Sequence, residues 1–229
     1  IRWGLTGTVP KADYEFMGLK CSIGEVANRI QASELQDKGV LANCHVNVLQ
    51  TQDHPQFKTY SEELKWLTTD TTRMTWVANT IKDIATSGNT LILVDRISAG
   101  ELLEKQIKNS VFVSGSTKNM ERKEQYDEIS TATNKVIIAT YGVASVGINI
   151  PRIFNLVLIE PGKSFVRVIQ SIGRGIRKAE DKDSVQIWDI TSSCKFAKRH
   201  LGARKKFYKE ANYPYNIEKI DYENPYTRR

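Results

Sequence analysis

Residues 135–151 read K-V-I-I-A-T-Y-G-V-A-S-V-G-I-N-I-P, a short apolar strand that runs directly into a glycine-containing loop. Strands of the same kind are predicted at 90–94, 111–113, 154–159 and 185–190, with helical segments between them. Short apolar strands that alternate with amphipathic helices are typical of βαβ crossovers, in which helices cover both faces of a parallel sheet. The sequence therefore predicts an α/β fold, a three-layer sandwich built around a parallel sheet.

Further elements are expected around this alternating core. A strand is predicted at 40–50, and residues 61–86 are expected to be helical with an interruption near 68–72. The chain after Tyr213 is expected to be irregular. Helices are predicted at 24–35, 98–108, 118–130, from 163 onward and at 191–211.

Small and polar residues follow the predicted strands. Because ligands bind beyond the carboxyl ends of the strands in open parallel sheets, these residues mark the expected functional edge. They are Thr6-Gly7-Thr8, Asp95-Arg96, Ser114-Gly115, Thr140-Tyr141-Gly142 and Glu160-Pro161. A hydroxyl and a glycine directly after a strand can offer an O–H and backbone N–H groups to a phosphate.

A predicted helix at 166–177, V-R-V-I-Q-S-I-G-R-G-I-R, places an amide and two guanidinium groups on one face. Gln170, Arg174 and Arg177 stand at i, i+4 and i+7, and guanidinium groups bind phosphate oxygens bidentately. A solvated helix with two surface arginines is the alternative, and the order of the other motifs argues against it.

Positive charge is concentrated in the last third of the chain. The net charge is +7 over 229 residues, and the segment from Lys163 to the end holds 16 Lys and Arg against 8 Asp and Glu. This favours a polyanionic partner on that side, with a solubilising tail as the alternative. The predicted helix after Cys194 either contacts a duplex or junction, or is a solvated face packed by Phe196, Leu201 and Phe207. Its cations are Lys195, Lys198, Arg199, Arg204, Lys205, Lys206 and Lys209.

The cysteines and histidines exclude several classes of protein. Cys21, Cys44 and Cys194 lie far apart without C-x-x-C spacing, and the three histidines form no metal-ligand pattern. This argues for a reducing compartment and against a zinc site or a disulfide framework. No apolar run reaches the roughly 18 residues of a membrane span, so we expect no membrane partner.

The order of the motifs resembles superfamily 2 helicases. The run T-x-G-x-x-x-x-G-I-N from Thr140, followed by one strand and then Q-x-x-G-R-x-x-R from Gln170, resembles motifs V and VI. Residues 5–8 resemble motif III, residues 91–96 resemble motif IV, and residues 111–115 resemble the strand and loop after it. Within the superfamily, A-T-Y-G-V-A-S-V-G-I-N and V-Q-I-W-D-I resemble the phage UvsW branched-DNA helicases. The resemblance covers about residues 1–10 and 40–200.

The resemblance implies a RecA-like second motor domain at residues 41–192. Residues 1–40 would then be the end of the first RecA-like domain with motif III and a connector, and residues 193–229 a basic helix and C-terminal tail. The chain contains neither G-x-x-x-x-G-K-[ST] nor D-E-x-[DH], which hold ATP and Mg²⁺ in P-loop motors. Ile1 is not methionine, which suggests a fragment of a longer protein. Because both motifs are missing, we expect a C-terminal half that does not hydrolyse ATP alone, with both cofactors held mainly by the N-terminal RecA-like domain.

The resemblance also implies roles for single residues. Arg174 and Arg177 would be catalytic arginine fingers that reach the γ-phosphate of ATP, and Gln170, Gly147 and Asn149 would lie near the nucleotide. The family often has aspartate where Asn149 stands. The remaining expected residues are Thr6, Gly7 and Thr8 for coupling, and Arg96, Ser114, Gly115 and Thr140 for contacts to the nucleic-acid backbone.

The whole protein is then expected to be a monomeric ATP-dependent DNA helicase of phage recombination and repair. Its partner would be branched or duplex DNA, or an RNA–DNA hybrid, in the cytoplasm of the bacterial host. Three alternatives remain at this stage. They are a restriction-type duplex translocase subunit, a non-catalytic RecA-like nucleic-acid-binding module, and a metabolic nucleotide-binding α/β enzyme, which the lack of G-x-G-x-x-G disfavours.

Overall fold

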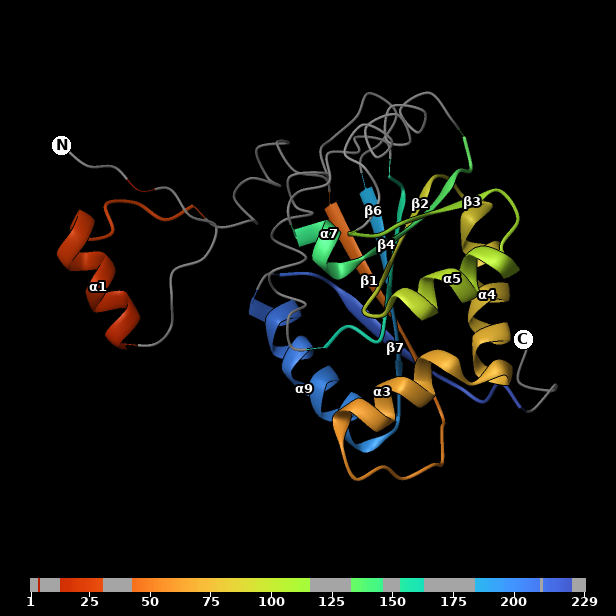
Figure 1. Cartoon of the computed structure of the whole chain (residues 1–229). Helices are drawn as coiled ribbons and strands as arrows, with labels where there is room; N and C mark the ends of the chain where they lie inside the picture. The colour runs from red at the N-terminus through yellow and green to blue at the C-terminus, as the bar shows by residue number, and fades with distance from the viewer. Residues whose placement is uncertain are drawn as a thin grey trace.

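The centre of the molecule is a seven-stranded sheet in which every pair of neighbouring strands is parallel. The computed structural model describes residues 4, 13–30, 43–115, 133–145, 153–162, 184–210 and 212–223 (Figure 1). The strand order is β3-β4-β2-β5-β6-β1-β7. The strands are β1 (Asn43–Thr51), β2 (Thr90–Val94), β3 (Ser110–Val113), β4 (Val136–Thr140), β5 (Asn155–Ile159), β6 (Ser184–Ser192) and β7 (Tyr215–Ile220). The predicted parallel α/β sheet is confirmed.

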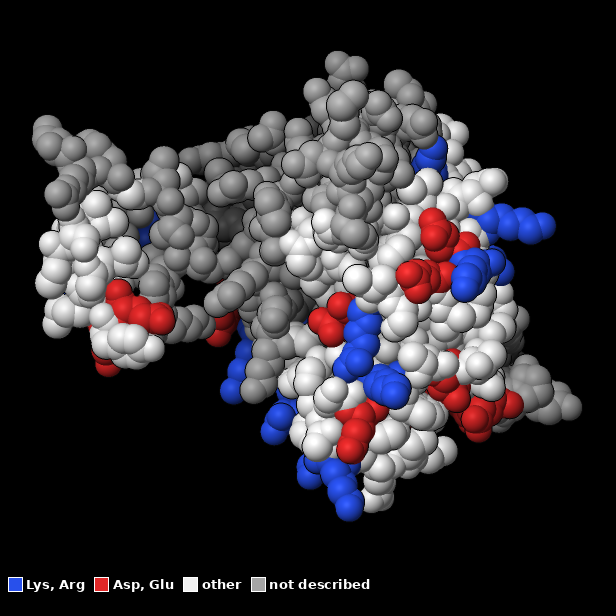
Figure 2. All heavy atoms as spheres, in the orientation of Figure 1, with Lys and Arg blue, Asp and Glu red and all other residues white. Residues whose placement is uncertain are grey.

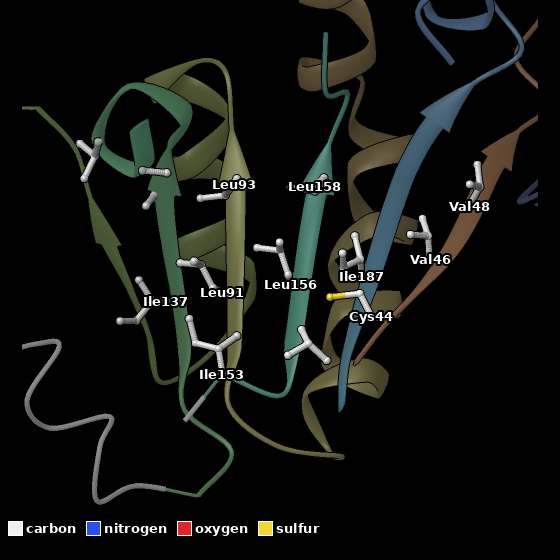
Figure 3. Packing of buried hydrophobic residues seen from close by; sticks show 14 of the residues in the cluster. Cys44, Val46, Val48, Leu91, Leu93, Ile137, Ile153, Leu156, Leu158 and Ile187 are labelled. Atoms are coloured by element: carbon white, nitrogen blue, oxygen red, sulfur yellow. The ribbon is translucent and has the colours of Figure 1, made fainter. Parts of the chain in front are cut away.

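Helices cover both faces of the sheet, as predicted. The helices are α1 (Asp13–Ile23), α3 (Tyr60–Thr69), α4 (Thr71–Ala85), α5 (Ile97–Gln106), α7 (Tyr141–Ser145) and α9 (Lys195–Glu210). Leu91 and Leu93 of β2 join an apolar cluster with α7 and α9, part of which Figure 3 shows. Ile92 and Val94 of the same strand join a second cluster with α4 and α5. Alternate side chains of one strand therefore enter the two layers of core.

The interruption predicted near residues 68–72 is confirmed and lies at Asp70. This residue follows α3 and caps α4, because its carboxylate accepts a hydrogen bond from the backbone N–H of Arg73 at 2.9 Å. At the start of α3, Thr59 and Glu62 form a reciprocal capping box. Asp70 therefore ends α3 and begins α4, and the two helices point in different directions (Figure 1).

The prediction of a helix at 24–35 is wrong over its described part. Helix α1 ends at Ile23, and Gly24 follows with a φ of 95°, in the left-handed region that ends helices. Residues 31–35 lie outside the described residues, as does the helix predicted at 118–130. Helix α1 buries none of its side chains, so no apolar stripe marked it in the sequence.

The prediction that the chain is irregular after Tyr213 is also wrong. Strand β7 pairs in parallel with β1, from Val46 opposite Tyr215 to Thr51 opposite Ile220. Four of its six residues are exposed, so the alternation that identifies a half-buried strand is absent. Exposed Glu218 and Lys219 are typical of an edge strand, where charge opposes pairing with another molecule.

No helix within the described ranges combines the length and apolarity that a bilayer crossing needs. The three cysteines are free thiols, with Cys21 exposed and Cys44 and Cys194 buried.

Candidate nucleic-acid interface at the carboxyl edge of the sheet

Three of the predicted nucleic-acid loops follow neighbouring strands of the sheet. Strands β3, β4 and β2 are adjacent and parallel, so the loops at Ser114-Gly115, Thr140 and Arg96 leave the same edge side by side. The register places Thr140 opposite Val94, and Ala139 opposite Val113, one residue before Ser114. Neighbouring strands are about 4.8 Å apart, so the three loops fall in one row.

Thr140 starts helix α7 through its side chain. Its Oγ1 accepts a hydrogen bond from the backbone N–H of Val143 at 3.4 Å, and the side chain is half-buried. A hydroxyl that accepts in this way can still donate its own proton, and a phosphate oxygen needs such a hydrogen-bond donor. The structure thus places an oriented O–H at the end of β4.

Arg96 is held against helix α3 in this structure. It is half-buried, and its Nη2 donates to the hydroxyl of Ser61 at 3.0 Å and to the carbonyl of Ser61 at 3.4 Å. Its Nε is buried and, within the described part of the chain, has no hydrogen-bond partner. The contact with Ser61 fixes the guanidinium next to the end of β2, with part of its donor capacity unused.

Ser114 and Gly115 differ in how far they are open to a partner. Ser114 is buried, whereas Gly115 is exposed and a Cβ added there would meet nothing within 4 Å. Backbone at Gly115 is therefore accessible to a ligand, and Ser114 anchors the loop to the sheet.

A buried ionic network that the sequence did not predict lies at the carboxyl ends of β1 and β5. Arg73 is fully buried, and its Nη2 lies 2.5 Å from Oε1 of Glu160 while its Nε lies 3.5 Å from Oδ2 of Asp53. Thr51 donates to Asp53 at 2.6 Å and accepts from Arg73 at 3.2 Å. Tyr222, just beyond β7, donates to the other oxygen of Asp53 at 2.6 Å. The network ties together α4 and the ends of β1, β5 and β7.

Glu160 is a carboxylate of the network whose pKa is shifted. Burial raises the pKa of Glu160 to about 7, against the opposing effect of Arg73 and Arg204. Asp53 and Asp189 also raise this pKa, because three carboxylates here face only two guanidinium groups. Glu160 also has a φ of 45°, a left-handed conformation that is uncommon for a residue other than glycine.

A second buried pair joins α9 to β6. Arg204 binds Asp189 through Nε at 2.8 Å and Nη2 at 3.0 Å, and Tyr208 donates to the same carboxylate at 2.7 Å. Arg204 also donates to the carbonyl of Pro161, directly after Glu160. The expectation that Arg204 belongs to the exposed basic face of this helix is therefore wrong. Its place on the apolar stripe with Ala197, Leu201 and Tyr208 was the signal that could have shown this.

The residues expected to face ATP lie outside the described residues. They are Gly147, Asn149, Gln170, Arg174 and Arg177, and the coupling residues Thr6, Gly7 and Thr8 lie outside as well. Within the described ranges no group of three His, Cys, Asp or Glu side chains could hold a metal ion. What the described edge offers is hydroxyl, guanidinium and backbone groups suited to a phosphodiester chain.

Comparison with known proteins shows what this chain is similar to. Residues 72–179 match the helicase conserved C-terminal domain family. One similar protein is the ATP-dependent DNA helicase uvsW of Enterobacteria phage T4. It is 27% identical over 217 residues, which are 90% of this chain and 43% of the relative.

Two further comparisons agree. The putative helicase 22 of Sulfolobus islandicus filamentous virus is 35% identical over 104 residues, 44% of this chain and 18% of that protein. The crystal structure of T4 UvsW shares the fold, with a TM-score of 0.68 at 22% identity over 78% of this chain and 42% of that one. The chain spans less than half the length of the curated relatives it matches.

Proposed function

We propose that this chain forms the second motor domain of an ATP-dependent DNA helicase that remodels branched DNA. The observation that carries the proposal is the row of loops at Arg96, Ser114-Gly115 and Thr140, on one edge of a sheet in a chain similar to uvsW. These loops would hold the backbone of one strand without reading its sequence, because phosphate contacts position a protein but do not specify bases.

The chemistry of ATP hydrolysis would be shared between two RecA-like domains. Arg174 and Arg177 would stabilise charge on the γ-phosphate from this side, and such an arginine is worth about 10³ to 10⁵ in rate. Gln170, Gly147 and Asn149 would lie near the nucleotide, while Mg²⁺ and most phosphate contacts would belong to the N-terminal RecA-like domain. The coupling residues would be Thr6, Gly7 and Thr8, in the segment 1–40 that leads into the domain at 41–192.

The test is DNA-stimulated ATP hydrolysis by the full-length protein and its Arg174→Ala variant. We expect hydrolysis by the wild type and a loss of about 10³-fold or more in the variant. Arg29→Ala removes an exposed arginine of the described chain and is the matched control, which should hydrolyse ATP at the wild-type rate. The 229 residues alone should bind nucleic acid without hydrolysing ATP. If the wild type hydrolyses no ATP on any DNA or RNA, the chain is a RecA-like binding module instead.

Helicase and duplex translocase activities share these motifs, so a second assay separates them. Displacement of a labelled strand from a branched duplex supports the helicase. Displacement of a third strand from a triplex, without separation of the duplex, would assign a translocase of the restriction type. The same substrates with RNA in one strand test the RNA–DNA hybrid.

A further inference from the structure

Helix α9 presents a cationic face on the side that points away from the sheet. At about 100° per residue, six cations fall within an arc of about 120°, opposite the buried stripe of the same helix. Figure 2 shows Lys and Arg side chains gathered along the lower left of the molecule, where Figure 1 places α9. The six residues of this basic face are Lys195, Lys198, Arg199, Lys205, Lys206 and Lys209, all exposed except the half-buried Lys205.

Among the described residues, no acidic side chain forms an ion pair with this face. Ion pairs in the described part of the chain involve Lys20, Arg73 and Arg204, and none involves the six cations of the basic face. Lys195 and Arg199 only lie over the ring of Phe196, at 5.7 and 5.3 Å. Six neighbouring like charges repel one another, and an external polyanion would relieve that repulsion.

The helix that carries the basic face is fixed at both ends. Near its start, the carboxylate of Glu63 accepts hydrogen bonds from the backbone N–H groups of Phe196 at 3.0 Å and Ala197 at 2.7 Å. Further along, Arg204 and Tyr208 are both bound to the buried Asp189. The cations therefore project from a pre-organised support, which lowers the entropic cost of binding a partner.

Gly202 lies at the middle of the basic face. Glycine is a poor residue for a helix interior, and nothing inside the protein requires it here, because an added Cβ would meet no atom within 4 Å. Exposed Ala203 follows, so small residues separate the cations near Lys198 from those near Lys206. At 1.5 Å per residue the centres of the two groups are about 14 Å apart, and the major groove of B-DNA is about 12 Å wide.

We propose that the basic face binds a DNA duplex, with one group of cations on each phosphate backbone beside the major groove and Gly202 at the closest approach. The proposal deepens the proposed function and rests on it for the identity of the partner. The loops at the carboxyl edge would hold a single strand, and α9 would hold the duplex arm beside it. Two separate backbone contacts on one domain suit a substrate that contains both forms of DNA.

The experiment measures the affinity of the full-length protein for a fluorescent duplex and a fluorescent single strand, by anisotropy over a range of salt concentrations. The test variant is Lys198→Ala/Lys205→Ala/Lys206→Ala. The control variant, Lys65→Ala/Lys105→Ala/Lys108→Ala, removes the same charge from exposed positions on α3 and in and just after α5.

We expect the test variant to bind the duplex about tenfold or more weakly, with a log–log salt slope shallower by about 2 to 3, and to bind the single strand as the wild type does. Gly202→Glu, which adds bulk and negative charge at the closest approach, should weaken duplex binding more than Gly202→Ala does. Equal losses of duplex affinity in the test and control variants would mean that the positive charge of the whole protein attracts DNA diffusely, and would overturn the proposal. Unchanged duplex affinity in the test variant would overturn it as well. A wild type without ATPase activity refutes the proposed function, whereas duplex binding by α9 is measured without ATP.

Discussion

Replacing Arg204 with methionine should destabilise the protein by about 3 to 5 kcal/mol, because it leaves the carboxylate of Asp189 buried without its counter-ion. Arg204 is 3% exposed and Asp189 is 0% exposed, and two hydrogen bonds of 2.8 and 3.0 Å join them. Methionine keeps an unbranched apolar chain, so the packing of α9 is largely retained and the loss is electrostatic. For a domain of this size, the fall in melting temperature should be about 6 to 20 °C.

Thermal and urea unfolding of the full-length protein, followed by circular dichroism, measure this loss. Lys205→Met is the matched control, since the neighbouring side chain is half-exposed and unpaired with any described acid, and should change stability by less than about 0.5 kcal/mol. Adding Asp189→Asn to Arg204→Met should restore part of the loss by removing the stranded charge. A loss below about 1 kcal/mol in the single variant would refute the assignment of Arg204 to the core.

Two further predictions concern stability. Because the pKa of Glu160 is raised from 4.5 to about 7, its contribution of up to about 3 kcal/mol is full below pH 4.5 and is lost as the pH rises through 7. Urea unfolding should therefore show that the free energy of unfolding of Glu160→Gln, relative to the wild type, is higher at pH 8 than at pH 5. An equal difference at both pH values would contradict this. Gly202→Ala should stabilise α9 by about 1 kcal/mol, since nothing lies within 4 Å of the added Cβ. Gly88→Ala should cost more than about 1 kcal/mol, since Gly88 has a φ of 143° and the Cβ would lie 2.8 Å from Phe154. Melting temperatures that move in the same direction for both glycines would contradict this pair.

The elements that could be predicted from the sequence are those whose own residues show a pattern of apolar, polar and capping side chains. Strand β2 is buried along its length and apolar after Thr90, because both faces of the sheet are covered. The division at Asp70 follows from its capping chemistry. Strand β7 could not be predicted, because its place depends on pairing with β1 far away in the sequence rather than on any alternation of its own. Helix α1 buries nothing and so had no apolar stripe to predict it.

The candidate site divides in the same way. The general rule for parallel sheets predicts that Arg96, Ser114 and Thr140 lie at one edge of the sheet. Only the strand order was needed to show that their loops are neighbours. The network around Arg73 could not be predicted, because Arg73 donates hydrogen bonds to Thr51 and Glu160, which lie 22 and 87 positions away and leave no local pattern. Ion pairs between distant elements depend on the packed fold, and no local pattern in a single sequence indicates which residues form them.

Strand β1 has a consequence for how the protein is made. Its two neighbours in the sheet are β6 and β7, so Val46 is paired with Ile187 and Tyr215. During synthesis this apolar strand emerges long before either partner, and such distant pairings form slowly. Until residues up to Ile220 have left the ribosome, the strand's backbone groups and its valines remain open to wrong partners. Chaperones that bind nascent chains should therefore be engaged early and released late, and production of the protein should respond more to their abundance than to changes in its surface residues.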